Sequence, residues 1–187
     1  TIDNKKKSVS FINKDKFKKN LIENLEFKLT NSQLTVINEI QSDLFSNKQM
    51  IRLLQGDVGS GKTIVALISM LTVIESGYQV TLMAPTSILA YQHFENISKL
   101  IDKLPIEIDI LTGKDKGGKR LEKLEKIKKG YTKIIIGTHA LIQEGVNFNK
   151  LGLSVIDEQH RFGVYQRMAF NYKGFRPSIL VMSATPI

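Results

Sequence analysis

The stretch "GDVGSGKT", residues 56–63, contains residue types suited to binding a nucleotide phosphate. It fits the pattern G-x-x-x-x-G-K-[ST] at every defined position, although an ordinary glycine turn before a helix is the alternative interpretation. Its glycines allow several backbone amides to point at one phosphate, and the following helix adds its positive N-terminal end. Lys62 would reach the β- and γ-phosphates, and the Thr63 hydroxyl would ligate magnesium. The predicted nucleotide-binding residues of the loop are Gly56, Asp57, Gly59, Ser60, Gly61, Lys62 and Thr63.

Two adjacent acids, Asp157 and Glu158, directly follow the apolar run "LGLSVI". Carboxylates at the end of a buried strand are costly to desolvate unless they have a positive partner. A magnesium ion bound to nucleotide phosphates supplies that partner. Asp157 would then hold the metal ion, while Glu158 would orient and polarise the attacking water. Such a pair alone often marks only a solvated strand end. Together with the phosphate loop it predicts a nucleoside triphosphatase whose catalytic residues are Lys62, Asp157 and Glu158.

The segments that must position these residues alternate between strand and helix patterns. Short apolar runs predict strands at 50–55, 78–85, 106–113, 133–139, 153–158 and 178–185. Apolar residues at helical spacing predict helices over 30–44, over a segment containing 97–104, and over 114–130. The phosphate loop predicts a further helix directly after it, over 63–74. Continuous apolar strands that alternate with amphipathic helices are typical of a parallel sheet covered on both faces. The sequence therefore predicts an α/β fold.

Composition narrows the class of protein and of partner. The chain has 187 residues, of which 42% are hydrophobic, so we expect one compact domain. It has no cysteine, which excludes disulfides and thiolate metal sites and fits a reducing, cytoplasmic compartment. No apolar run approaches membrane length, so we expect no membrane partner. Lysine and arginine number 27 against 18 acidic residues, and this formal charge of +9 favours nucleic acid as the partner.

Two lysine-rich segments have open interpretations. Residues 1–26 are predicted to be a solvated linker or domain-joining segment, with a nucleic-acid-binding arm as the alternative. The segment 114–133 is either a solvated helix face, with Leu121, Leu124 and Ile127 on its apolar side, or a surface that faces DNA. Because the chain starts at a threonine and stops just after a predicted strand, we expect it to be a piece of a longer protein.

The motifs and their order resemble the superfamily 2 helicases and translocases from about Phe27 to the C-terminus. "LLQGDVGSGKTIVALI" resembles that family's first motif, "VIDEQHRFGVYQR" its second, and "MSATPI" its coupling motif. "MAPTSILAYQHF", "LTG" and "GTHALIQ" resemble its DNA-contacting motifs. "DEQH" instead of "DEAD" argues against the RNA-helicase branch. The resemblance implies a RecA-like ATP-binding domain at residues 27–187 that uses ATP and Mg²⁺. "GTHALIQ" with "DEQHRFGVYQR" is most similar to the bacterial helicases that remodel stalled forks and Holliday junctions in recombination and repair.

The resemblance also implies roles for individual residues. Gln33 would read the adenine edge, with Phe27 packing nearby, although Gln33 alone could be a solvated helix residue. The implied DNA track, which would contact chiefly phosphates, consists of Pro85, Thr86, Gln92, Thr112, Gly113, Thr138 and His139. The implied residues that couple hydrolysis to this track are His160, Ser183 and Thr185. As alternatives, the histidines could be satisfied in the core and the threonines could cap helices or end strands.

The family's motors bind ATP between two RecA-like domains, and the second domain supplies an arginine finger. We therefore expect partners within a longer chain, namely a second motor domain and a DNA-wedging domain, and DNA that is branched or forked. The isolated 187 residues should bind nucleotide weakly, hydrolyse ATP slowly or not at all, and fail to unwind DNA. Three other functions stay open: the motor of a transcription-repair coupling factor, a non-motor P-loop enzyme, and a nucleotide-independent DNA-binding module.

Overall fold

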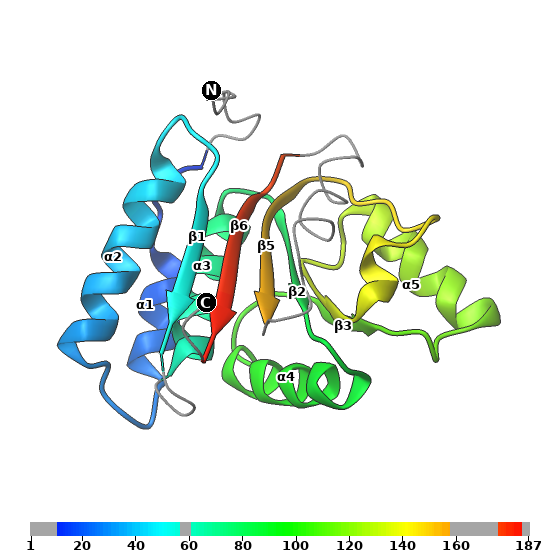
Figure 1. Ribbon diagram of the computed structural model, residues 1–187, viewed down its shortest axis with the longest axis horizontal. Helices are drawn as coiled ribbons and strands as arrows, with labels where there is room; N and C mark the ends of the chain where they lie inside the picture. The colour runs from blue at the N-terminus through cyan, green and yellow to red at the C-terminus, as the bar shows by residue number, and fades with distance from the viewer. Residues whose placement is uncertain (1–10, 57–60, 158–175, 185–187) are drawn as a thin grey trace.

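The computed structural model describes residues 11–56, 61–157 and 176–184, which form a parallel sheet between layers of helix (Figure 1). The six strands are β1 (Ile51–Gln55), β2 (Gln79–Met83), β3 (Ile108–Leu111), β4 (Ile134–Gly137), β5 (Leu151–Asp157) and β6 (Ser178–Ser183). They lie in the order β1-β6-β5-β2-β4-β3, and every neighbouring pair is parallel. The predicted α/β fold with a parallel sheet is confirmed.

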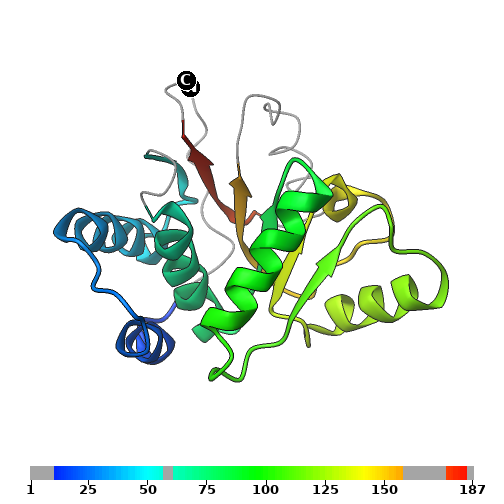
Figure 2. The same cartoon turned by 90° about the horizontal axis from the view of Figure 1, so that it is seen from below.

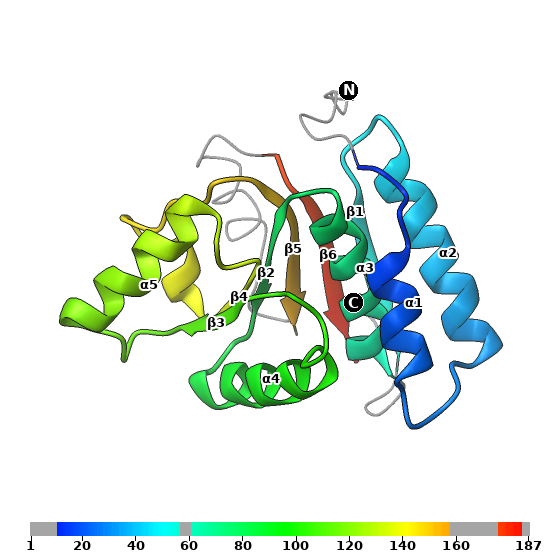
Figure 3. The same ribbon diagram turned by 180° about the vertical axis from the view of Figure 1, so that it is seen from behind.

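Helices α3 (Lys62–Glu75) and α4 (Ser87–Leu100) cover one face of the sheet, and α2 (Asn31–Phe45) packs against α3. Seen from behind, α3 has α1 packed against it (Figure 3), and its contacts with the sheet are chiefly to β2 and β5. All residues of α3 from Ile64 to Ile74 are buried, because the sheet covers one side of this helix and α1 and α2 cover the other. This packing fixes the first turn of α3, which carries Lys62.

A second, smaller core covers the opposite face. It contains Met83, Leu111, Ile135 and Ile156 of the strands together with residues of α5 (Gly117–Lys129) and of the 3₁₀ turn η1 (His139–Ile142). Viewed from below, α5 lies at the far end of the molecule from α1 and α2 (Figure 2). Leu121, which the sequence places on the apolar side of α5, is 66% exposed. The apolar side of α5 is therefore narrower than its sequence suggests, and among its residues only Ile127 is fully buried.

Local sequence explains how the first helix layer begins and ends. Thr30 caps α2, since its hydroxyl accepts a hydrogen bond from the Gln33 amide and the Gln33 side chain accepts one from the Thr30 amide. The apolar residues Ile37, Ile40 and Leu44, which recur at helical spacing along α2, are fully buried. Helix α4 ends at Leu100, so Leu104 packs against the core from the following turn rather than from the helix.

The N-terminal segment corrects one prediction. Residues 16–23 form helix α1 (Lys16–Glu23), which packs against α3. Phe11 and Leu21 are buried, and the Phe11 ring meets Tyr78 edge-on at a centroid distance of 5.4 Å. The solvated-linker interpretation is therefore wrong for residues 11–26, because their apolar side chains join the core. Residues 1–10 lie outside the described part. No helix in the described part is both long and apolar enough to span a bilayer.

Candidate nucleotide and nucleic-acid site

The predicted functional residues gather at one edge of the sheet, because all parallel strands end on the same side. The half formed by β1, β6 and β5 ends in Gly56, Ser183 and Asp157. The half formed by β2, β4 and β3 leads into Pro85, Thr138 and Thr112. The residues predicted to bind nucleotide thus occupy one half of the edge, and those predicted to bind DNA occupy the other. The boundary between the halves lies between β5 and β2.

The described parts of the phosphate loop are held at both ends. The Gly56 amide donates to the Ser183 carbonyl at 3.2 Å, which ties the end of β1 to the end of β6. The Lys62 ammonium donates to the Gly56 carbonyl at 2.5 Å. Gly61 precedes α3 with φ 81°, and an added Cβ would overlap the Gln33 side-chain amide, so both the backbone angle and the available space require glycine there. Asp57, Gly59 and Ser60 lie outside the described residues.

A pocket of about 180 Å³ adjoins this loop. Its lining residues are Thr30, Ser32, Gln33, Val36, Leu54, Gln55, Gly56, Lys62 and Val65. The capping interaction with Thr30 uses the Gln33 side-chain oxygen, so the amide nitrogen of Gln33 is directed toward Gly61. Gln33 is thus a half-buried capping residue rather than a solvated one, and it shares a pocket with Lys62.

Phe27 lies elsewhere. It is 52% exposed and lines a different, larger pocket of about 310 Å³ between the end of α1 and the end of α4. Because the phosphate loop does not line that larger pocket, its size does not make it the nucleotide site. The structure does not bring Phe27 into the pocket that Gln33 and Lys62 share, so the packing implied for it is not found in this conformation.

Asp157 ends β5 and is mostly buried, with a side chain 15% exposed. Its Oδ2 lies 2.5 Å from Nε2 of His93 on α4, whose side chain is 13% exposed. His93 was not predicted as a functional residue. A signal for it existed, because His93 falls between Ala90 and Ile97 on the apolar stripe of α4, where a polar side chain must find a buried partner.

The oxygen donors near the loop fit a magnesium ion. Asp157 offers a carboxylate, and Thr63 offers a hydroxyl from the first turn of α3, where it is half-buried. Mg²⁺ is usually held by one or two protein carboxylates and completes its shell with substrate phosphates and water. Within the described residues no group of three or more histidines, cysteines and acids could hold a metal by itself. One carboxylate and one hydroxyl suit a metal ion that arrives with nucleotide phosphates. Glu158, His160 and Thr185 lie outside the described residues.

On the other half of the edge, Thr86 caps α4 by accepting a hydrogen bond from the Leu89 amide at 3.2 Å. Pro85 precedes it and is half-buried, while Gln92 is exposed on the outer side of the helix. Thr138 and His139 follow β4, the first half-buried and the second exposed at the start of η1. The capping alternative therefore describes the Thr86 hydroxyl, while Gln92 and His139 are accessible to a ligand.

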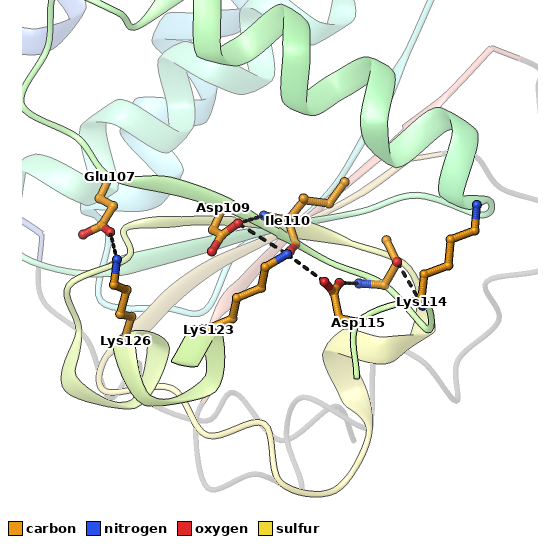
Figure 4. A network of polar contacts seen from close by, with 8 residues as sticks. Glu107, Asp109, Ile110, Lys114, Asp115, Lys123 and Lys126 are labelled. Carbon is orange, nitrogen blue, oxygen red and sulfur yellow. Dashed lines mark hydrogen bonds and ion pairs between the residues drawn. The ribbon is translucent and has the colours of Figure 1, made fainter. Parts of the chain in front are cut away.

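The turn after β3 is held by a network of charged side chains (Figure 4). The Thr112 amide donates to the Asp115 carboxylate at 2.8 Å, and the Thr112 hydroxyl accepts from the Lys114 amide. Lys123 of α5 donates to Asp115 and to the Ile110 carbonyl, both at 2.8 Å. Thr112 is completely buried, so any contact from this turn must come from its backbone or from the exposed Gly113 and Lys114.

Electrostatics keep the Asp115 carboxylate ionised. Partial burial alone would raise its pKa, but hydrogen bonds from Lys123 and the Thr112 amide and the charges of Lys123 and Arg120 outweigh it, so the pKa is lowered. Glu107 likewise raises the pKa of Lys126 by accepting its hydrogen bond. Some lysines of the 114–133 segment are therefore paired within the domain. Others are exposed, namely Lys114, Lys116, Lys119 and Lys128.

Comparison with known proteins agrees with this arrangement. A family model described as DEAD/DEAH box helicase matches residues 30–187. The chain is 50% identical over 174 residues to the ATP-dependent DNA helicase RecG of Haemophilus influenzae, covering 91% of this chain and 25% of that protein. It is 48% identical over 186 residues to RecG of Aquifex aeolicus, covering 98% of this chain and 24% of that protein. The chain thus spans about a quarter of the length of these relatives.

Solved structures give the same result. The structure of RecG bound to a three-way DNA junction aligns with a TM-score of 0.87 and 43% identity, over 97% of this chain and 24% of that one. Mss116p bound to single-stranded RNA and AMP-PNP aligns with a TM-score of 0.74 over 92% of this chain and 39% of that one. The identity to Mss116p is 24%, so that likeness concerns the fold alone.

Proposed function

The chain belongs to the DEAD/DEAH box helicase family, and from this we propose that it is the first motor domain of an ATP-dependent DNA helicase that remodels branched DNA. About 50% identity to RecG sequences over most of the chain favours this assignment over the motor of a transcription-repair coupling factor. A likeness to a RecG structure bound to a three-way junction makes forks and Holliday junctions the proposed substrates. The proposed domain extends over residues 27–187.

The proposed nucleotide site is the half of the edge at β1, β6 and β5. Lys62 and the loop amides would bind the ATP phosphates, and Gln33 would contact the adenine from the wall of the adjoining pocket. Thr63 and Asp157 would hold a magnesium ion, which when bound supplies charge neutralisation on the phosphates. Glu158 would orient the attacking water, in keeping with its place directly after Asp157.

The proposed DNA track follows the other half of the edge. The exposed Gln92 and His139 and the turn at Gly113 supply polar groups along it, and the exposed lysines of α5 add positive charge. Contacts of this kind bind phosphates without reading bases, which suits a motor that must move along any sequence. His160, Ser183 and Thr185 would couple this track to hydrolysis.

One observation carries the proposal: β6 alone separates the phosphate loop from Asp157 in the sheet, and a hydrogen bond from Gly56 to Ser183 joins the loop to β6. The end of β6 is therefore in contact with the loop that would hold the phosphates, and its neighbour β5 ends in the carboxylate that would hold the metal. An ordinary glycine turn does not require this arrangement of a lysine, a hydroxyl and a buried acid.

The rest of the full-length protein is a proposed partner. A second RecA-like domain would close over the nucleotide and supply an arginine, which in phosphoryl-transfer enzymes contributes about 10³–10⁵ in rate. A wedge domain would engage the branch point. On this proposal the 187 residues alone hydrolyse ATP slowly or not at all and do not unwind DNA.

The test is ATP turnover by the full-length protein with single-stranded, duplex and forked DNA. We expect forked DNA to stimulate turnover most strongly, and we expect Lys62→Ala to abolish that stimulation. Turnover that ignores DNA would refute the motor assignment. Equal stimulation by every DNA would refute the preference for branched DNA while leaving the motor in place.

A further inference from the structure

Helix α4 joins the two halves of the proposed site. Its N-terminal end carries Thr86, and its exposed side carries Gln92, both proposed to face DNA. The next residue, His93, is directed toward the opposite side of the helix, where Ala90 and Ile97 are buried. One helix therefore presents a DNA-facing side chain outward and a polar side chain inward at consecutive residues.

The inward side chain contacts the nucleotide half. His93 Nε2 and Asp157 Oδ2 are 2.5 Å apart, and both side chains are mostly buried. His93 lies on the helix that follows β2, and Asp157 ends β5, the parallel neighbour of β2 in the sheet. The contact therefore crosses the boundary between the two halves at the one strand pair where they meet.

Because both side chains are mostly buried, the contact ties the position of Asp157 to that of His93. Water screens the contact between His93 and Asp157 little, because both side chains are largely covered. With Oδ2 held by His93, the orientation of the Asp157 carboxylate follows the orientation of α4. The same carboxylate is the one that would hold the metal. A shift of α4 when a DNA backbone binds moves the His93 ring and, with it, this carboxylate.

We propose that His93 is a positioning residue that transmits DNA binding on α4 to the metal-holding Asp157. This inference rests on the proposed function and adds to it a specific link between the two sites. It makes a thermodynamic demand, because a link of this kind is reciprocal: if DNA strengthens nucleotide binding by some factor, nucleotide strengthens DNA binding by the same factor. Removing the link should bring that factor close to one while each separate affinity persists.

The experiment uses the full-length protein and two replacements of His93. His93→Leu keeps an apolar side chain of moderate size and removes the ring nitrogen, whereas His93→Gln keeps an N–H donor near the place of Nε2. Asn96→Ala is the matched control, because Asn96 is an exposed residue of the same helix. The first measurement is the affinity for forked DNA by fluorescence anisotropy, with and without Mg²⁺ and a non-hydrolysable ATP analogue. The second is the kcat and KM of ATP turnover with and without forked DNA.

For His93→Leu we expect the nucleotide-dependent change in DNA affinity to disappear. We expect DNA-stimulated kcat to fall about tenfold, while KM for ATP and the nucleotide-free DNA affinity change less than about threefold, as for loss of an interaction made only in the coupled state. His93→Gln should restore most of the coupling, and Asn96→Ala should match the wild type. If His93→Leu fails to fold, His93→Ala is measured in the same way.

Two results would overturn the inference. One is a His93 variant without the donor that keeps the full nucleotide-dependent change in DNA affinity. The other is a loss of activity that parallels the loss of thermal stability across the variants and that His93→Gln does not reverse. His93 would then only support the packing of the core. A wild-type protein without any DNA stimulation would instead refute the proposed function, and this inference with it.

Discussion

Replacing Gln79 with methionine should destabilise the domain by about 3 kcal/mol. Gln79 begins β2 at the edge of the sheet opposite the proposed site, and it is only 1% exposed. Its Nε2 donates to the carbonyls of Ile127 and Thr132, both at 2.9 Å. Its Oε1 accepts from the amides of Asn149 and Lys150, at 2.8 and 3.0 Å. One side chain thus joins the end of α5, the start of β4 and the segment that enters β5.

The magnitude follows from these contacts. Four hydrogen bonds at about 1 kcal/mol net each give about 4 kcal/mol. Two effects reduce the loss. The Ile127 carbonyl keeps a second donor, the Gly130 amide at 3.1 Å, and the exposed Asn149 and Lys150 backbone can recruit water. Methionine has nearly the same length as glutamine, so the packing contribution is small, and about 3 kcal/mol remains.

Urea unfolding of the chain, followed by circular dichroism, measures this loss as a shift in midpoint at constant slope. Gln92→Met is the control, because Gln92 is exposed on α4 and its replacement should change the free energy of unfolding by less than about 0.5 kcal/mol. A Gln79→Met loss as small as that of the control would show that the four hydrogen bonds do not stabilise the fold. The premise that buried polar groups must keep their hydrogen-bond partners would then be wrong for Gln79.

Four further predictions concern the site and its supports. Lys62→Ala in the full-length protein should lower ATP turnover by about 100-fold or more, measured by phosphate release, because the phosphates lose a direct positive partner. Lys123→Met should weaken DNA binding more than Lys119→Met in an anisotropy titration, because Lys123 holds the turn after β3 whereas Lys119 contributes only an exposed charge. The folded-state pKa of Asp115 is lowered, so its contribution to stability is present above the unfolded-state pKa of about 3.9 and is lost as pH falls through the folded-state pKa. When thermal midpoints are measured against pH, the decrease on the acid side should therefore be smaller for Asp115→Asn than for the wild type. Gly137→Ala should lower the thermal midpoint by several degrees, because the added Cβ would overlap a backbone carbonyl of β3, and an unchanged midpoint would contradict the tight approach of β3 and β4.

Much of the fold follows from the sequence because its signals are local. Strands β2, β4 and β5 are mostly apolar and buried along nearly their whole length, as expected for strands covered on both faces. The cap at Thr30 and the stripe of Ile37, Ile40 and Leu44 are likewise set by neighbouring residues. Strand order could not be predicted in this way, because the adjacency of β6 to β1 and β5 depends on packing between segments far apart in the chain.

The errors have a common physical cause. Residues 11–26 are rich in lysine, and the charge pattern hid the apolar side chains of Phe11 and Leu21, whose burial depends on the presence of α3. Leu121 was placed on the apolar side of its helix, yet the second face of the sheet supplies too little cover to bury it. In both cases the local pattern of apolar residues does not predict burial, because burial depends on which other segments of the chain pack against that surface.

The site divides in the same way. The phosphate loop could be read from the sequence because its chemistry is contained in eight consecutive residues, 56–63. His93 could not be assigned a role in this way, because its partner lies 64 residues away and the pairing exists only once β2 and β5 are neighbours. A motor needs both kinds of feature: a local motif that binds the phosphates, and a long-range contact through which events at a second ligand reach it. Sequence motifs identify the first kind, whereas the second kind depends on which strands the fold makes adjacent. In this chain the adjacent pair is β5 and β2, so we expect substitutions at their junction to alter coupling more than they alter either binding step.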